Sequence, residues 1–243
     1  MNLPNAITVG RIAVTPLIAL LPFVNSWPLR ALAFVIYILT AISDYWDGML
    51  ARSRGLVTDL GKMLDPLADK LLLLGTFVPM YLLGGGTAAW SPFTGQGAFS
   101  LDPNGPGVGR AFPFITPLGA VGLPLWIVLV VLGREFLMTM FRQIAARRGV
   151  VIGAIGPAKW KAGFQYTWVG ASYFWFAYAT WFLESGWTPA TGASYRYALD
   201  FAYFNGIVAT ISMVVAVALT LWSLWLYLFR YGYLLRPGTA AAR

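Results

Sequence analysis

Long apolar stretches recur along the chain, separated by short polar segments. A transmembrane helix needs about 20 mostly apolar residues to cross about 30 Å of hydrocarbon. Windows of that length predict six spans, at residues 7–24, 29–47, 64–84, 112–132, 160–183 and 201–229. No internal repeat, heptad pattern or soluble region interrupts them, so we expect residues 1–243 to form a single domain. The predicted fold is an all-α integral membrane protein with six transmembrane helices.

Basic residues are distributed unevenly between the predicted loops. Of the 17 Lys and Arg residues, all but Arg30, Arg110 and Arg196 fall on the side that holds both termini. Cytoplasmic loops of membrane proteins carry an excess of Lys and Arg, so we expect both termini to be cytoplasmic. The first span follows no cleavable signal pattern and is expected to stay in the protein. The expected location is the inner or plasma membrane, crossed several times.

Composition limits the chemistry available to the chain. Hydrophobic residues make up 58% and charged residues 11%, with a mean hydropathy of +0.68. The net charge of +8 is explained by the cytoplasmic bias of Lys and Arg, so we expect membrane lipid and no nucleic acid as a partner. The chain has no Cys and no His. Metal binding and proton transfer therefore fall to carboxylates, which favour hard ions such as Mg²⁺ or Mn²⁺.

Five of the nine acidic residues lie between Asp44 and Asp69, where the second predicted span ends and the third begins. A carboxylate near hydrocarbon costs a few kcal/mol unless it is paired or coordinated, so such acids are candidates for a functional site. Asp44 and Asp47 are three residues apart, and Asp65 and Asp69 are four apart. Each spacing places a pair on one face of a helix.

Four carboxylates on two facing helices repel one another unless cations lie between them. Two divalent ions would balance the four charges and would clamp a phosphoryl centre. We therefore predict Asp44, Asp47, Asp65 and Asp69 as ligands of two Mg²⁺ or Mn²⁺ ions. The simpler interpretation is that these acids only form ion pairs in a polar loop with the nearby basic residues Arg52, Arg54, Lys62 and Lys70.

Small residues flank the acids. Gly48 follows Asp47, and Gly61 lies four residues before Asp65, so the backbone can approach a bulky ligand at both helix ends. Ala51 is also small, and Arg52 is placed to contact a phosphate. Helix packing alone is the alternative explanation for any one of the small residues.

Together these residues follow one spacing pattern over 26 residues: Asp44, Asp47, Gly48, Ala51, Arg52, Gly61, Asp65 and Asp69. The pattern resembles, without departure, the signature of the CDP-alcohol phosphatidyltransferase family. The resemblance implies a six-span fold, often a homodimer, with a cytoplasm-facing polar cavity that binds a CDP-lipid and two metal ions. It also implies that Asp69 is both a metal ligand and the general base, and that Gly48, Ala51, Arg52 and Gly61 line the CDP-lipid site.

Three weaker motifs resemble the members of this family that use glycerol 3-phosphate as acceptor. They are the start from Asn2 to Arg11, the run from Asp65 to Lys70, and Arg134-Glu135 followed by a basic helix. The implied reaction joins CDP-diacylglycerol and sn-glycerol 3-phosphate to give phosphatidylglycerophosphate and CMP. Other acceptors, such as inositol phosphate, serine or another alcohol, stay open.

A phosphorylated acceptor needs fixed cations near the acids. The expected set lies on the predicted cytoplasmic side: Arg134, Arg142, Lys159 and Lys161. Cytoplasmic topology or contact with anionic headgroups is the alternative explanation for these residues. Asn5, Thr8 and Arg11 recur at helical spacing, so we expect them to face the polar cavity, with Asn5 and Thr8 at the CDP-lipid. A helix-capping role for Asn5 is equally open.

Two other classes of function stay open. Intramembrane acids also serve ion or proton transport, although a transporter gives no reason for the spacing of Gly48, Ala51, Arg52 and Gly61. An inactive family member kept as an assembly partner gives no reason for the intact aspartates.

Overall fold

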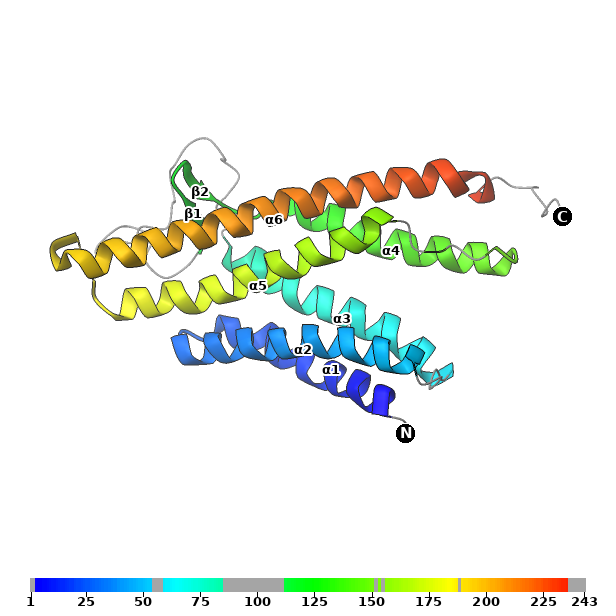
Figure 1. The fold of residues 1–243 in the computed structure, drawn as a ribbon, viewed down its shortest axis with the longest axis horizontal. Helices are drawn as coiled ribbons and strands as arrows, with labels where there is room; N and C mark the ends of the chain where they lie inside the picture. Colours follow the sequence, from blue (N-terminus) through cyan, green and yellow to red (C-terminus); the bar gives the residue numbers. More distant parts are fainter. Residues whose placement is uncertain are drawn as a thin grey trace.

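The structure, a computed structural model, describes residues 3–53, 59–84, 112–150, 153, 156–187 and 189–235, and these are mostly helical. Their α-helices are α1 Leu3–Leu20, α2 Trp27–Ser53, α3 Asp59–Leu83, α4 Leu125–Arg147, α5 Gly156–Glu184 and α6 Ala193–Tyr231 (Figure 1). Short 3₁₀ turns are η1 Leu21–Phe23, η2 Pro189–Thr191 and η3 Gly232–Leu235.

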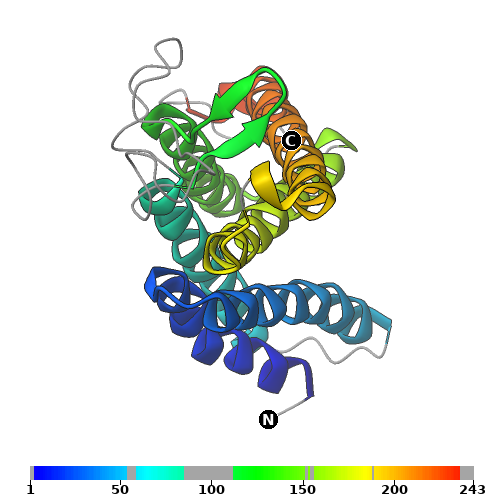
Figure 2. The ribbon, with the colours of Figure 1, turned by 90° about the vertical axis from the view of Figure 1, so that its left-hand side faces the viewer.

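The helices run back and forth along the long axis of the molecule (Figure 1). Helix α1 packs against α2 and α3, and α5 packs against α2, α3 and α6. Seen end-on, α1 and α2 form one side of the bundle, α4 and α6 form the other, and α5 lies between them (Figure 2). The start of α1, the end of α2, the start of α3 and the end of α6 share one end of the bundle (Figure 1). The acidic cluster therefore lies at that end.

Helix α5 supplies much of the core. Trp168, Trp175 and Phe176 are almost fully buried, and the ring of Trp168 meets Phe77 of α3 edge-on with centroids 5.0 Å apart. The Tyr173 hydroxyl donates to the Ile18 carbonyl of α1 at 3.1 Å. Aromatic side chains combine a large apolar area with a polar tip, so they bury surface and also satisfy backbone acceptors between helices. Helix α5 thereby fixes α1 and α3, the helices that position the site.

Four segments are long and apolar enough to cross a membrane, among the residues that the structure describes: Asn5–Phe23, Trp27–Asp44, Leu64–Leu83 and all of α6. They confirm four of the six predicted spans in outline, although α6 has 39 residues and exceeds the expected 201–229. Helices α4 and α5 are not among them. Within α4, the charged residues Arg134, Glu135 and Arg142 fall in every stretch of 18 residues, and six crossings stay a prediction.

The predicted span at 112–132 is wrong over its first half. Strands β1 Phe114–Thr116 and β2 Gly119–Val121 pair antiparallel there, and α4 begins only at Leu125. Proline lacks an N–H and ends regular helix, and Pro113, Pro117 and Pro124 interrupt this stretch. Gly119 has φ +126°, which favours glycine and turns the hairpin. Hydropathy averages do not register these breaks.

The hairpin is anchored against α5 and α6. Trp175 donates from Nε1 to the carbonyls of Phe112 and Pro113, at 3.2 and 3.0 Å. On α6, a Cβ added to Gly206 would overlap the carbonyl of Ile115. Only glycine allows the β1 backbone to lie this close to the helix. The hairpin is therefore a packed part of the bundle.

Candidate active site

Three of the four expected aspartates gather around one arginine. Arg11 of α1 forms an ion pair with Asp44 of α2 through Nη1, and the same nitrogen lies 3.4 Å from Asp69 Oδ1. Its Nη2 lies 3.8 Å from Asp65 Oδ1. The helical spacing of Asp65 and Asp69 places both on the side of α3 that faces α1. The guanidinium of Arg11 therefore links α1 to α2 and α3 through their carboxylates.

Neutral donors hold two of these carboxylates from other directions. The Thr8 hydroxyl donates to Asp65 Oδ1 at 2.9 Å, and the Tyr166 hydroxyl of α5 donates to Asp44 Oδ2 at 3.1 Å. Thr8 and Arg11 are three residues apart, so both lie on the inner face of α1. The structure thus places Thr8 and Arg11 on the polar side of the first helix, as the sequence indicated.

The acids are open on the side away from Arg11. The side chains of Asp65 and Asp69 are 56% and 62% exposed, whereas that of Arg11 is 4% exposed. Arg11 therefore forms the buried base of the cluster, and the carboxylates face outward. A ligand approaching from outside would meet carboxylate oxygens first.

The donor set suits a hard divalent cation. The available atoms are carboxylate oxygens, and the chain has no Cys or His to attract a softer metal. The cluster already accommodates one positive charge, that of Arg11. Within the described part of the chain, no three acidic side chains are close enough together to hold one ion between them. The side chain of Asp47, the fourth expected ligand, lies outside the described residues.

The residues expected to line a CDP-lipid site are only partly described. Asn5 and Gly61 are buried near the starts of α1 and α3. The side chains at positions 48, 51 and 52 (Gly48, Ala51, Arg52) lie outside the described residues. The predicted grouping of these positions around one ligand therefore stays a prediction.

A second charged cluster contains two of the four basic residues expected to bind the acceptor. Arg134 of α4 donates from Nη1 to Glu135 at 2.8 Å, and Lys161 of α5 forms an ion pair with the same carboxylate oxygen. Arg134 also donates from Nη2 to the Ser223 hydroxyl of α6 at 3.0 Å. Arg134 and Lys161 are each 5% exposed. Buried cations persist only when they are paired in this way.

The other two expected cations are not part of this cluster as described. Arg142 lies two turns further along α4 and is exposed, and the side chain of Lys159 lies outside the described residues. The structure therefore brings Arg134 and Lys161 together through Glu135, and it leaves the proposed roles of Arg142 and Lys159 as predictions.

The acidic and basic clusters are neighbours. Lys70 follows Asp69 on α3, and its ammonium lies 5.6 Å from the centre of the Phe136 ring, which follows Glu135 on α4. Along α5, Tyr166 lies five residues after Lys161, which corresponds to a rise of roughly 7.5 Å. The two clusters are thus connected through α5 and through the contact between α3 and α4.

Sequence reasoning did not identify Tyr166, Glu135 or Ser223 as site residues. Tyr166 is one of 12 tyrosines, and only the packing of α5 against α2 brings its hydroxyl to Asp44. Ser223 lies in the last third of a 39-residue apolar helix and gave no signal. Glu135 carried the best signal, because an acid between basic residues at a predicted helix suggests a shared counterion.

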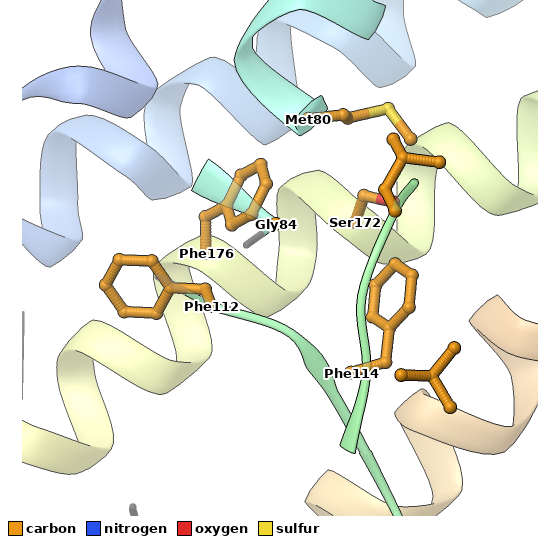
Figure 3. A pocket seen from close by; sticks show the side chains of 8 residues that line it. Met80, Gly84, Phe112, Phe114, Ser172 and Phe176 are labelled. Carbon is orange, nitrogen blue, oxygen red and sulfur yellow. The ribbon is translucent and has the colours of Figure 1, made fainter. Parts of the chain in front are cut away.

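A small pocket lies away from both clusters, and it is apolar (Figure 3). Met80 and Gly84 from the end of α3, Ser172 and Phe176 from α5, and Phe112 beside the hairpin line it. Met80 lies 11 residues beyond Asp69, or roughly 16 Å along α3. This pocket is a packing gap beneath the hairpin and is separate from the predicted polar cavity.

Comparison with known proteins agrees with the motif spacing. The family model described as CDP-alcohol phosphatidyltransferase matches residues 1–98 and 101–234.

The chain belongs to the CDP-alcohol phosphatidyltransferase family.

Individual relatives within this family share shorter stretches. A CDP-diacylglycerol–glycerol-3-phosphate 3-phosphatidyltransferase of Rickettsia bellii is 50% identical over 72 residues, which are 30% of this chain and 40% of that protein. One of the same name from Bacillus subtilis is 32% identical over 165 residues, 63% of this chain and 66% of that protein. A probable phosphatidylglycerophosphate synthase of Mycobacterium tuberculosis is 27% identical over 162 residues, 65% and 57%. The match thus spans less than two thirds of each of these relatives.

Proposed function

We propose that this family member transfers the phosphatidyl group of CDP-diacylglycerol to sn-glycerol 3-phosphate, with phosphatidylglycerophosphate and CMP as products. The observation that supports it most is the gathering of Asp44, Asp65 and Asp69 around Arg11, with a basic cluster beside them. The family match and the names of the relatives support the same reaction and acceptor.

Two Mg²⁺ or Mn²⁺ ions are proposed as cofactors, held by Asp44, Asp47, Asp65 and Asp69. Such ions, when bound, neutralise charge on the phosphoryl oxygens and on the departing CMP. The chain's own contribution is to position the ligands. Thr8 and Tyr166 hold Asp65 and Asp44 in fixed orientations by hydrogen bonds at 2.9 and 3.1 Å. Such supporting contacts orient metal ligands and tune their affinity.

Asp69 is the proposed general base. Its side chain is 62% exposed, so an acceptor hydroxyl can approach the carboxylate from its outer side. The carboxylate would take the hydroxyl proton as the acceptor oxygen bonds to the β-phosphorus and the bond to CMP breaks. Both substrates are held at one site, so the acceptor oxygen can displace CMP in a single step. No covalent enzyme intermediate is then needed.

The acceptor phosphate is assigned to the basic cluster. Arg134 and Lys161 supply two cations against the single charge of Glu135, which leaves one net positive charge in a buried setting. A phosphate oxygen there gains more than it would in water, because the local dielectric is low. Arg142, near the end of α4, and Lys159, near the start of α5, are proposed as further contacts of the acceptor phosphate.

The CDP-lipid is assigned to the other side of the aspartates. Asn5 and Thr8 would contact it from α1, and Gly48, Ala51, Arg52 and Gly61 from the ends of α2 and α3. Thr8 already contacts Asp65, which supports its place at the edge of the metal site. The lipid tails would extend between helices into the bilayer.

A six-span topology with both termini and the active site on the cytoplasmic side is proposed. The start of α1 and the end of α6 at one end of the bundle support an even number of crossings (Figure 1). Asp44 and Asp65 lie at or near the ends of candidate spans, at the same end. A homodimer in the inner or plasma membrane stays a prediction of the family resemblance.

The test is CMP release from CDP-diacylglycerol by the purified chain with Mg²⁺ or Mn²⁺ and a panel of acceptors. The proposal expects release with sn-glycerol 3-phosphate that exceeds release with inositol phosphate, serine or glycerol at least tenfold. Release with another acceptor instead would keep the chemistry and replace the substrate. Absence of release with every acceptor, together with ion flux in liposomes, would favour a transporter.

A further inference from the structure

Arg11 occupies the position where a cation is most favourable in the acidic cluster. Its two terminal nitrogens contact Asp44, Asp65 and Asp69, and its side chain is almost fully buried beneath them. Among the described residues, one guanidinium thus meets three carboxylates. Arg11 is therefore an internal counterion that these acids share.

A divalent ion and this guanidinium compete for the same oxygens. Asp44 Oδ1 and Asp69 Oδ1 both face Arg11 Nη1, and an ion bound to either oxygen would lie within a few ångströms of a like charge. Burial at 4% exposure limits the screening of that repulsion by water. Arg11 therefore weakens divalent binding as long as it stays paired with the aspartates.

A nucleoside diphosphate gives Arg11 another partner. The guanidinium presents a planar fork of donors that matches phosphate oxygens as well as carboxylates. A diphosphate at the exposed side of Asp65 and Asp69 brings at least two negative charges to the cluster. A phosphate oxygen that passes between these acids to the guanidinium takes over its donors, and the carboxylate oxygens become available to the ions.

We propose that Arg11 is a counterion switch that makes tight divalent metal binding conditional on the diphosphate of the substrate. The inference rests on the proposed function, because it takes the aspartates as metal ligands. The coupling is reciprocal by thermodynamic linkage, so the metal also strengthens diphosphate binding by the same factor. Without metal, Arg11 links α1 to α2 and α3 through the acids of those two helices.

The first test uses the unmodified protein. Mn²⁺ binding to the purified full chain is measured by electron paramagnetic resonance with and without cytidine diphosphate, in the absence of an acceptor. The proposal expects the Kd for Mn²⁺ to fall at least tenfold when cytidine diphosphate is added. An unchanged Kd would overturn the switch and leave the proposed function standing. Failure to bind Mn²⁺ under either condition would count against the proposed function itself.

The second test changes the counterion. In Arg11→Gln, Mn²⁺ should bind about tenfold more tightly than in the unmodified protein without nucleotide, and cytidine diphosphate should add less. Arg11→Lys keeps the charge and should retain weak binding without nucleotide. Equal or weaker Mn²⁺ binding by a folded Arg11→Gln would contradict the proposal. If that variant does not fold, the proposal is tested by the first experiment alone, which compares the Kd for Mn²⁺ of the unmodified protein with and without cytidine diphosphate.

Arg30→Gln is the matched control. Arg30 is also a 4% exposed arginine, but it lies at the start of α2, where it donates to the Pro22 carbonyl at 2.8 Å and to Thr180. Its loss removes a buried guanidinium far from the aspartates. The control should lower thermal stability and leave the Kd for Mn²⁺ unchanged. A change as large as that of Arg11→Gln would show that any buried arginine has the same effect.

Discussion

The hydroxyl of Tyr166 offers a precise perturbation of the proposed metal site. Its hydrogen bond to Asp44 Oδ2 is 3.1 Å long, and Tyr166→Phe removes that bond while keeping the ring. A hydrogen bond to a charged group contributes about 1.5–3 kcal/mol. The length of this bond and the 40% exposure of Tyr166 favour the lower end. A loss of about 1.5 kcal/mol corresponds to about tenfold weaker binding of the ion that Asp44 helps to hold.

The assay is CMP release as a function of Mn²⁺ concentration at saturating substrates. Tyr166→Phe should raise the Mn²⁺ concentration for half-maximal rate about tenfold, with a smaller change in the maximal rate. Tyr178→Phe is the control, because Tyr178 also lies on α5 and donates at 3.0 Å, to the Ala198 carbonyl. If both variants showed the same Mn²⁺ dependence as the unmodified protein, Tyr166 would have no part in holding the metal ligand Asp44.

Two further predictions concern the basic cluster and the hairpin. Glu135→Gln leaves Arg134 and Lys161 without their shared carboxylate, and should lower the free energy of unfolding by about 2 kcal/mol, measured by thermal unfolding in detergent. Gly206→Ala would overlap the Ile115 carbonyl and should lower Tm by about 5 °C, since overpacking costs about 1–3 kcal/mol. The α4 control Gly133→Ala has open space at its Cβ and should not lower Tm; equal Tm values for the two alanine variants would contradict the packing of the hairpin.

Local spacing made the first three helices and their acids predictable. Asp65 and Asp69 are four residues apart, and a helix places such a pair on one face whatever its neighbours do. The inner face of α1 followed in the same way from the spacing of Thr8 and Arg11. These features depend only on the period of a single helix, so the spacing of residues in the sequence is enough to predict them.

Contacts between distant helices could not be predicted. The sequence placed Arg11 on a polar face, but only the packing of α1 against α2 and α3 makes it the centre of three carboxylates. The same holds for Tyr166, which is 122 residues from Asp44. The expected span at 112–132 failed for a local reason, because an apolar average does not register prolines that exclude a helix.

The role of Asp69 in phosphatidyl transfer is tested most directly by comparing CMP formation by the unmodified protein and by Asp69→Asn. Both are purified in the same lipid nanodiscs with CDP-diacylglycerol, sn-glycerol 3-phosphate and Mg²⁺, and Asp200→Asn on α6 is the control. We expect CMP and phosphatidylglycerophosphate in equal amounts from the unmodified protein and from the control, and a rate at least a thousandfold lower for Asp69→Asn. Turnover by Asp69→Asn at the rate of the unmodified protein would contradict this role.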